Sequence, residues 1–425
     1  MTTISSVRIN EQRFWSTVEA SSEIGTIPAT AEHGAGLSRL TLTDADKTMR
    51  DLFVSWCEDA GLRVTVDRMG NIFARRGGLN DALSPIMLGS HLDTQETGGR
   101  FDGVLGVLGA LEVVRTLNDA KHVTRRPIEI VNWTNEEGGR FPPPMVASGC
   151  FAGVYDVEWA HALVDDGGIR LGDELARLGY LGTSDVGRQG TIGIPAAYLE
   201  LHIEQAPILD RERVQVGIVT HAFSVDGFRM AFHGATAHAG TRPMELRQNA
   251  LVAAARLATA VDDIGQEFSA SGGMATAVRI TAFPNKAGII SSEAEFVCDV
   301  HHADPEIAAS MADRVRGAAL DAGSRTNCQM EIKDTWQWGG HIFDEEIVDA
   351  LQDTAEHIGA SHRDIASQAG HDAYFMARIC PTAMIFTPCR EGITHHPDEY
   401  TTLEETAPGI NVLLHTAISL ADCSD

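Results

Sequence analysis

The sequence predicts an α/β fold in which a mixed sheet is flanked by helices, with a smaller α+β domain inserted into the chain. Three short apolar runs each end in polar residues, which is typical of buried sheet strands that end at a site: PIMLGSHLD, PIEIVNWTN and AAYLELHIE. A helix rich in small residues, VLGVLGALEVVRTL, lies between the first two runs. This alternation indicates a sheet covered by helices.

Length and composition agree with a folded, acidic protein of two or three domains. The chain has 425 residues, of which 44% are hydrophobic, and its net charge is -26. Such a charge disfavours a nucleic-acid partner or docking on an anionic membrane. Seven scattered cysteines without a CxxC pair indicate reduced thiols. Because no apolar run approaches the roughly 20 residues of a membrane span, and Arg8 and Glu11 interrupt the start, we expect a soluble cytoplasmic protein.

The elements before the first apolar run are predicted as helices followed by a hairpin. The first 60 residues have a helical pattern, and residues 44–60 place Met49, Phe53 and Cys57 on one face. RVTVDR and IFARR, separated around Gly70-Asn71, predict the hairpin. Farther along, the glycine-containing residues 151–190 predict a helical excursion with loops.

The pattern changes from about Ile218, where strands and two helices interleave. Three strand-like runs alternate with predicted helices at about 244–265 and 304–322: SVDGFRMAFHG, ATAVRITAFP and SEAEFVCDVHH. After Trp336 a helix (343–358), the strand PTAMIFTP and a helix (402–421) follow. Three consecutive domains would explain this order. An insertion is the preferred interpretation, because the last segment carries a histidine-rich loop like the loops of the first part.

Candidate metal ligands follow the predicted strands. His91 and Asp93 follow the first run, and Asp102 comes nine residues later. Imidazole and carboxylate oxygen both suit Zn²⁺ or Mn²⁺. A histidine ligand needs an orienting group on its second ring nitrogen, and Asp93 is spaced to provide a carboxylate there. Nearby glycines allow the tight turn that would bring Asp102 back toward His91.

The other strand ends supply further ligands and a candidate proton acceptor. Glu136 and Glu137 follow the second run, His202 follows the third, and His395 lies after PTAMIFTP. Two adjacent carboxylates repel each other unless a cation intervenes, so one can bind metal while the other handles protons. The five groups His91, Asp102, Glu137, His202 and His395 suit two ions that share a bridging carboxylate.

Several motifs together resemble the M20-type metallopeptidase superfamily, and specifically its hydantoinase/carbamoylase branch, over residues 10–420. The motifs are HLDT with GGRFDG, TNEEGGRF, LELHIEQ, GATAHAG, RQNAL, GHDA and GITHHPDE. This branch includes N-carbamoyl-L-amino-acid hydrolases, β-ureidopropionases, and allantoate and ureidoglycolate amidohydrolases. HIEQ resembles this branch rather than the general peptidases, which tend to have a carboxylate at the position of His202.

The resemblance implies a zinc-aminopeptidase-like catalytic domain and a role for each matching residue. Residues 1–217 and 332–425 would form the catalytic domain, and 218–331 an inserted lid and dimerisation domain. One ion would be held by His91, Asp102 and His202, and the other by Asp102, Glu137 and His395. Glu136 would be the general base, Gln205 would contact the ureido or amide group, and His238 would steady the oxyanion from the neighbouring subunit of a homodimer.

The lid departs from the family pattern Pro-Asn-x-x-Asn-Val-Ile-Pro and Asp-x-Arg-His. Here the segments are PNKAGIIS and DVHH, so Asn285 matches, Gly288 replaces the second Asn and His301 replaces the Arg. In relatives the two replaced side chains hold the substrate carboxylate. Asn249 stands where an Asp is usual.

The leading hypothesis is a two-metal amidohydrolase that cleaves a ureido or other linear amide C–N bond of a small molecule. An N-acyl deacylase or small peptidase is the second enzyme hypothesis, which HIEQ disfavours and the altered lid supports. A non-catalytic binding protein descended from such an enzyme is disfavoured by Glu136 and the complete ligand set.

Overall fold

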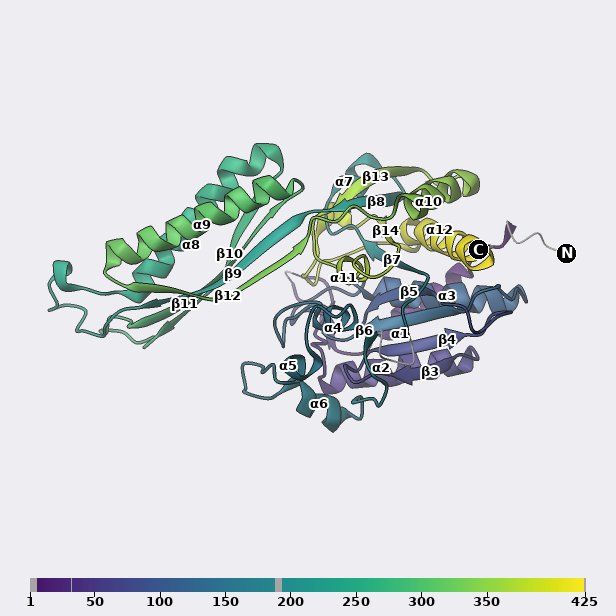
Figure 1. The fold of residues 1–425 in the computed structure, drawn as a ribbon, viewed down its shortest axis with the longest axis horizontal. Coiled ribbons are helices and arrows are strands. Elements are labelled where there is room, and N and C mark those ends of the chain that lie inside the picture. The colour runs from purple at the N-terminus through teal and green to yellow at the C-terminus, as the bar shows by residue number, and fades with distance from the viewer. Residues whose placement is uncertain (1–5, 32, 188–192, 424–425) are drawn as a thin grey trace. The chain divides into compact units, whose positions relative to one another are not determined.

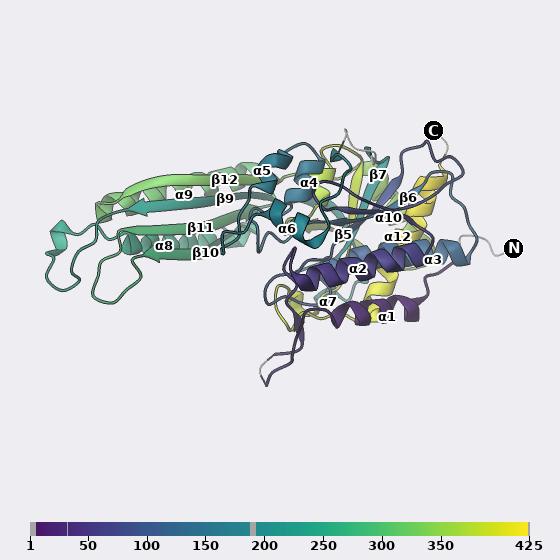
Figure 2. The same cartoon turned by 90° about the horizontal axis from the view of Figure 1, so that it is seen from below.

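The chain forms two compact units in the computed structural model, which describes residues 6–31, 33–187 and 193–423 (Figures 1 and 2). Unit 1 comprises residues 1–220 and 343–425, and unit 2 comprises residues 221–342. The chain therefore leaves the first unit once and returns to it. The boundary expected at 331 falls inside strand β12 (Gln329–Gly339), which pairs along its length with β9 (Ser224–His233) and so belongs entirely to unit 2.

Unit 1 is built on an eight-stranded mixed sheet with the order β13-β8-β14-β7-β5-β6-β4-β3. The strands are β3 (Arg63–Val66), β4 (Ile72–Arg76), β5 (Ile86–His91), β6 (Ile128–Trp133), β7 (Ala197–Ile203), β8 (Val216–Ala222), β13 (His362–Ser367) and β14 (Thr382–Thr387). The four central strands β14, β7, β5 and β6 are parallel, whereas β8, β4 and β3 are antiparallel to their neighbours. The predicted hairpin is the β3–β4 pair.

Two long apolar helices cover the central strands of this sheet. α3 (Val104–Asp119) and α12 (Leu403–Asp422) pack against each other and against β5, β7 and β14, and α1 (Glu11–Ser22) and α10 (Glu345–Ile358) pack outside them. α12 begins in a capping box, in which Thr402 and Glu405 satisfy each other's backbone N–H groups. The remaining helices are α2 (Asp44–Asp59), α4 (Val146–Phe151), α5 (Val157–His161), α6 (Leu171–Leu178), α7 (Ile208–Glu212) and α11 (Ala373–Met376).

The helical prediction for the first 60 residues is wrong between α1 and α2. That segment contains a two-stranded sheet of β1 (Thr26–Ile27) and β2 (Gly36–Leu37). α1 ends at Ser22, Gly25 then turns the chain with a φ of 83°, and Pro28 disfavours a further helix there.

Unit 2 is a four-stranded antiparallel sheet with the order β10-β11-β9-β12, covered by two helices. β10 (Met274–Phe283), β11 (Glu293–His302), α8 (Ala250–Phe268) and α9 (Pro305–Thr326) occur where strands and helices were predicted. In β11 every second residue is buried, and Phe296, Cys298 and Val300 join the core formed with both helices. The expected α+β layer is therefore present.

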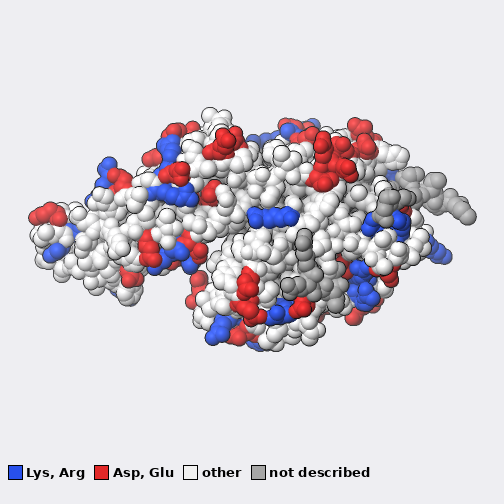
Figure 3. Space-filling view, in the orientation of Figure 1, with Lys and Arg blue, Asp and Glu red and all other residues white. Residues whose placement is uncertain are grey.

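The charged side chains at the surface agree with the acidic composition (Figure 3). Figure 3 shows groups of acidic side chains on the visible face with basic side chains scattered between them, in keeping with the net charge of -26. No helix within residues 6–31, 33–187 and 193–423 is long and apolar enough to cross a membrane. None of the seven cysteines, all of which lie in the described part of the chain, is in a disulfide, and only Cys423 is exposed.

Candidate metal centre

The parallel strands of unit 1 bring the predicted ligands to one edge of the sheet. His91 is the last residue of β5, Glu136 and Glu137 follow β6, His202 lies near the end of β7, and His395 lies beyond β14. These four strands are neighbours in the sheet, and the carboxyl ends of parallel strands share one edge. The order of the strands therefore explains why residues far apart in the sequence converge.

The converging side chains form two ligand sets that share Asp102. His91, Asp102 and His202 form one set, and Asp102, Glu137 and His395 form the other, with the ligand atoms of each set within 4.8 Å of one another. Asp102 Oδ1 lies 3.0 Å from His202 Nε2 and 3.5 Å from His91 Nε2. His395 Nε2 lies 3.5 Å from Asp102 Oδ2 and 3.2 Å from Glu137 Oε2.

Hydrogen bonds orient the two buried imidazoles toward Asp102. His91 Nδ1 donates to the backbone oxygen of Asp93 at 2.9 Å, and His202 Nδ1 donates to that of Ile203 at 2.9 Å. A proton on Nδ1 leaves the lone pair on Nε2, which faces the carboxylate. The Asp93 carboxylate, which was predicted to orient this ring, lies near the same nitrogen, with its Oδ1 3.8 Å from His91 Nδ1, but the Asp93 carbonyl is the closer partner.

The backbone comes unusually close to these side chains at Gly103. This residue has a φ of 65°, and a Cβ placed there would lie 2.3 Å from His91 Nε2. Only glycine fits both the left-handed conformation and this approach. The glycine-rich turn predicted after β5 therefore brings Asp102 and His91 together.

Three polar residues without a predicted role hold the carboxylates in place. Gln95 Nε2 donates to Glu137 Oε2 at 2.7 Å, and Thr394 Oγ1 donates to Asp102 Oδ2 at 2.7 Å. Glu399 accepts hydrogen bonds from the backbone N–H groups before and at Asp102. Gln205, the predicted substrate contact, lies at the same place, with its Nε2 2.6 Å from Asp102 Oδ2.

The electrostatics of this cluster favour added positive charge. Burial would lower the pKa of His91, but the charge of Glu136 and the nearby aspartates raises it well above its ordinary value. The Glu137 carboxylate raises the pKa of His395 to about 10. Burial would raise the pKa of Asp102, but the charge of His202 holds it well below its usual range. A cation bound here would satisfy the same carboxylates that raise these pKa values.

Glu136 differs from Glu137 in its surroundings. Glu136 Oε2 lies 3.4 Å from His91 Nε2, and burial raises the pKa of its carboxyl well above the usual value. It belongs to neither ligand set, whereas Glu137 belongs to one. The arrangement gives one glutamate to a cation and leaves its neighbour able to exchange a proton.

A buried histidine in the GHDA segment also lies at this site, although no role was predicted for it. The His371 ring centre is 4.4 Å from that of His202, and its Nε2 has no hydrogen-bond partner within the part of the chain that the structure describes. Asp372 beside it accepts from Ser148 Oγ. The segment follows a strand without strong apolar character, so no local pattern indicated this burial.

The four predicted substrate and oxyanion residues of the lid all lie in unit 2. His238 and Gly288 are neighbours, since His238 forms a bridge with Ile289 and Ala239 donates to the Gly288 carbonyl at 2.9 Å. Asn285 lies in the same loop, between β10 and β11. His301 is at the other end of β11, roughly 25 Å along the strand from Glu293 at about 3.3 Å per residue. Unit 2 therefore separates His301 from Gly288.

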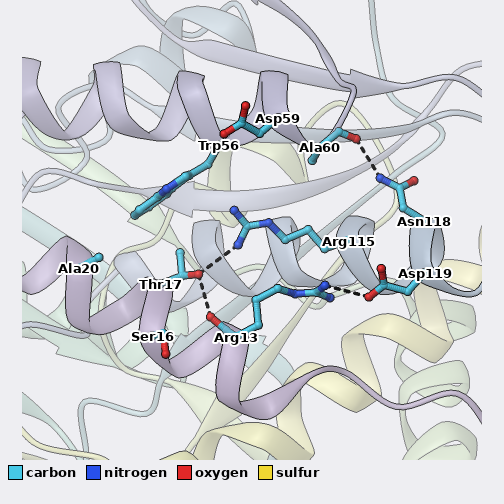
Figure 4. Close-up of a pocket in the computed structure, with 10 residues that line it drawn as sticks. All are labelled: Arg13, Ser16, Thr17, Ala20, Trp56, Asp59, Ala60, Arg115, Asn118 and Asp119. Carbon is cyan, nitrogen blue, oxygen red and sulfur yellow. Dashed lines mark hydrogen bonds and ion pairs between the residues drawn. The ribbon is translucent and has the colours of Figure 1, made fainter.

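A cleft in unit 1 contains none of the predicted site residues. It lies among α1, α2 and α3 (Figure 4) and is lined by Arg13, Ser16, Thr17, Ala20, Trp56, Asp59, Ala60, Arg115, Asn118 and Asp119. Arg13 pairs with Asp119 at 2.8 Å and with Glu112 at 2.7 Å, and Arg115 donates to Thr17 at 3.0 Å. Because these charged groups already have partners, the cluster around Asp102 is the better candidate site.

The fold and this cluster define an α/β protein with a candidate metal centre. The family model for peptidase family M20/M25/M40 matches residues 87–419, so the chain belongs to that family. It is 40% identical over 415 residues to an N-carbamoyl-L-amino-acid amidohydrolase of Rhizobium meliloti, which covers 98% of this chain and 97% of that protein. It is 32% identical to a ureidoglycolate hydrolase of Arabidopsis thaliana, over 91% of this chain and 82% of that protein.

A solved structure supports both the family and the branch. An amidase of the hydantoinase/carbamoylase family from Burkholderia vietnamiensis has a TM-score of 0.94 and 41% identity, and 99% of each chain is covered. The resemblance to this branch that the motifs indicated is therefore confirmed. The mixed sheet with flanking helices is confirmed as well.

Proposed function

We propose that the protein is a two-metal amidohydrolase that cleaves a linear amide or ureido C–N bond of a small molecule. The observation that carries this proposal is the pair of ligand sets sharing Asp102 at the carboxyl edge of the sheet. The relatives' names supply the substrate class, since the similar proteins include an N-carbamoyl-L-amino-acid amidohydrolase and a ureidoglycolate hydrolase.

The donor atoms fit two divalent cations of the Zn²⁺ or Mn²⁺ kind. Three imidazoles and two carboxylates suit either ion, and their mutual distances of 3.0–3.5 Å match the spacing of ligand atoms around one cation. His91 and His202 would hold one ion, and Glu137 and His395 the other, with Asp102 bridging. When bound, such a pair activates water and polarises the substrate carbonyl.

The protein's own residues would orient the substrate and move the proton. Glu136 would take a proton from the attacking water and deliver it to the leaving nitrogen as the C–N bond breaks. Gln205 would hold the ureido or amide group, and His238 would steady the developing negative charge. A ureido substrate would release an amine and carbamate, which decomposes to carbon dioxide and ammonia.

A homodimer joined through unit 2 would complete this site. The separation of His301 from Gly288 supports it, because residues at opposite ends of β11 in one chain cannot both reach one small substrate. In a dimer, one copy could supply the Gly288 end of β11 to a site and the other copy the His301 end. We accordingly assign residues 221–342 as a lid and dimerisation domain, with Asn285, Gly288 and His301 as its substrate-facing positions. The lack of disulfides among the described cysteines supports a reducing cytoplasmic location.

An N-acyl deacylase or small peptidase is the second candidate function. The changes at Gly288 and His301 keep it open, because they alter the positions that hold a carboxylate in relatives. A non-catalytic binding protein is disfavoured, because the chain has Glu136 and every proposed metal ligand.

Metal analysis and a substrate panel test the proposal together. The protein is expected to hold two transition-metal ions per chain at the centre around Asp102 and to release ammonia from ureido compounds, and a chelator should abolish both. Asp102→Ala is expected to lose both ions, whereas His395→Ala should chiefly weaken one. Full activity without transition metal would contradict the metal assignment. Hydrolysis of N-acyl amino acids or dipeptides in preference to every ureido compound would favour the second candidate.

A further inference from the structure

A third group of metal-ligating side chains lies in unit 1, outside the cluster around Asp102. His33, His396 and Asp398 place one ligand atom each within 4.8 Å of the others. His33 comes from the segment before β2, and the other two come from the loop after β14, so the fold joins parts of the chain that are far apart in sequence. No predicted site residue belongs to this group.

The distances in this group are close to those around a bound cation. His33 Nδ1 lies 3.5 Å from Asp398 Oδ2, and His396 Nδ1 lies 3.7 Å from the same oxygen. Ligand atoms bound at about 2.0–2.1 Å in a tetrahedron are about 3.3–3.5 Å apart. The two imidazole rings meet edge to face, with their centres 4.9 Å apart. Small side-chain movements would therefore bring all three groups onto one ion.

The backbone holds the two segments together without using the ligand oxygen Asp398 Oδ2. Gly34 N–H donates to Asp398 Oδ1 at 2.6 Å, which leaves Oδ2 toward the histidines. A Cβ at Gly36 would lie 2.6 Å from the Gly98 oxygen and 2.9 Å from Pro397 Cβ, so the close passage of the segments depends on this glycine. The group is thus built by a fixed contact between the segments.

The protonation pattern of His396 suits coordination. Asp398 N–H donates to His396 Nδ1 at 3.1 Å, which marks Nδ1 as the nitrogen that carries the lone pair. A cation that takes this lone pair would replace that hydrogen bond. The side chains of His33, His396 and Asp398 are 47%, 41% and 38% exposed, so water can complete the coordination.

The turn at His395 separates the two adjacent histidines. His395 has a φ of 53°, a left-handed conformation that non-glycine residues seldom adopt. Its ring faces Asp102 and Glu137, whereas the ring of His396 faces His33 and Asp398. One tight turn thereby assigns consecutive imidazoles to two different groups.

We propose that His33, His396 and Asp398 form a third divalent-metal site, which is open to solvent and distinct from the two-ion centre. Two imidazoles and one carboxylate favour Zn²⁺, Co²⁺ or Ni²⁺ over Mg²⁺ and Ca²⁺. A divalent ion binds more weakly at this exposed site than at the two ligand sets that share Asp102. An ion bound here cross-links the segment before β2 to the loop that carries His395, and so stabilises both.

Equilibrium dialysis of the full-length protein against Zn²⁺, with metal measured by mass spectrometry, tests this site. Wild type is expected to bind three ions per chain. His33→Ala and Asp398→Asn should bind two, with an affinity for a third Zn²⁺ at least tenfold weaker than that of wild type. Asp398→Asn keeps an oxygen for the Gly34 N–H and so preserves the loop contact. His357→Ala removes an exposed histidine from α10, outside the group, and should still bind three.

Thermal unfolding provides a second readout that does not depend on counting ions. Zn²⁺ added beyond two equivalents should raise the midpoint of wild type and of His357→Ala but not of His33→Ala. Excess Mg²⁺ should not displace the third ion. Equal stoichiometry in wild type and His33→Ala would overturn the third site. A protein that lacked the two-ion centre would instead bind one ion in wild type and none in His33→Ala, so failure of the proposed function gives a different result.

Discussion

Glu399 accepts a hydrogen bond through Oε1 from the backbone N–H of Asp102 at 3.0 Å, and the same oxygen accepts from Phe101 N–H at 2.9 Å. Its Oε2 lies 3.0 Å from Thr394 Oγ1, whose one hydroxyl proton is donated to Asp102 Oδ2 at 2.7 Å. A Cβ at Gly99 would lie 2.1 Å from Glu399 Cδ, so the turn packs directly on this carboxyl group. Glu399 therefore positions the shared ligand by holding its backbone.

Glu399→Ala is expected to weaken metal binding without removing a ligand. Two buried N–H groups would lose their acceptor, at about 1–3 kcal/mol each in stability, and loss of such an outer contact typically costs 10- to 100-fold in metal affinity. Glu399→Gln keeps one oxygen and should fall between wild type and Ala. Competition with a chromophoric chelator measures the affinity. Glu404→Ala, at an exposed position in α12, is the control; a Glu399→Ala affinity equal to that of this control would refute the positioning role.

The two adjacent glutamates should give opposite phenotypes. Glu136→Gln keeps the shape but removes the proton acceptor, so kcat should fall by about 10²–10⁴-fold while metal content stays near that of wild type. Glu137→Gln should lose metal, because Glu137 Oε2 lies 3.2 Å from His395 Nε2 in a ligand set. Near-full turnover in Glu136→Gln would show that the base is another group.

The sequence predicts the centre of unit 1 better than its edges. Apolar runs that end in polar residues mark β5, β6, β7 and β14, and every proposed ligand lies on one of these strands or in the segment that follows it. β12 and β13 were not predicted, because β12 is exposed along most of its length and β13 (HRDIAS) is largely polar, so neither has a buried-strand pattern. Glu399 was missed for another reason: its partners are backbone groups almost 300 residues away.

Stability should depend on pH through Glu129, a buried residue of β6 that is remote from the metal ligands. Burial raises the pKa of Glu129 to about 7, although Arg75 lies 3.9 Å away. In the unfolded chain this group ionises near pH 4.3, so between these values the folded state binds more protons. The contribution of Glu129 to stability is therefore largest below about pH 4 and falls as the pH rises to about 7, by about 3 kcal/mol.

Glu129→Gln removes this dependence, because the amide stays neutral. The variant should gain stability over wild type by about 3 kcal/mol more at pH 8 than at pH 4, measured as the difference between urea unfolding curves at each pH. Comparison of the two proteins at one pH cancels the other titrating groups. Glu19→Gln, an exposed substitution in α1, should show no such gain. A pH-independent difference for Glu129→Gln would mean that the group is ionised in the folded protein.

His238 should act on the site of the neighbouring subunit. In a heterodimer of one His238→Ala chain and one Glu136→Gln chain, action in trans would leave one complete site and about half of the wild-type activity. Action within a chain would leave none. Differently tagged chains allow the heterodimer to be purified, and each parent homodimer is the control for background activity. An inactive verified heterodimer would show that each chain completes its own site.

The last prediction concerns the carboxylate of the substrate. Arginine grips a carboxylate with a planar two-point fork, whereas histidine is shorter and offers at most one donor to it. With His301 in place of Arg and Gly288 in place of Asn, recognition of an α-carboxylate should be weaker, by roughly 10- to 100-fold for each lost contact of about 1.5–3 kcal/mol. The enzyme should therefore prefer a substrate that is bulkier or carries its polar group elsewhere.

Reversing both changes tests this prediction. Gly288 has a φ of 84° and open space where a Cβ would lie, and Asn tolerates this conformation, so Gly288→Asn with His301→Arg should fold. We expect kcat/KM to rise for N-carbamoyl-α-amino acids and to change little for non-carboxylate amides. Thr259→Arg, on the exposed face of α8, controls for added charge. Lys286 or Arg242 could instead bind the carboxylate; wild type would then cleave these substrates efficiently, and Lys286→Ala or Arg242→Ala would lose that activity.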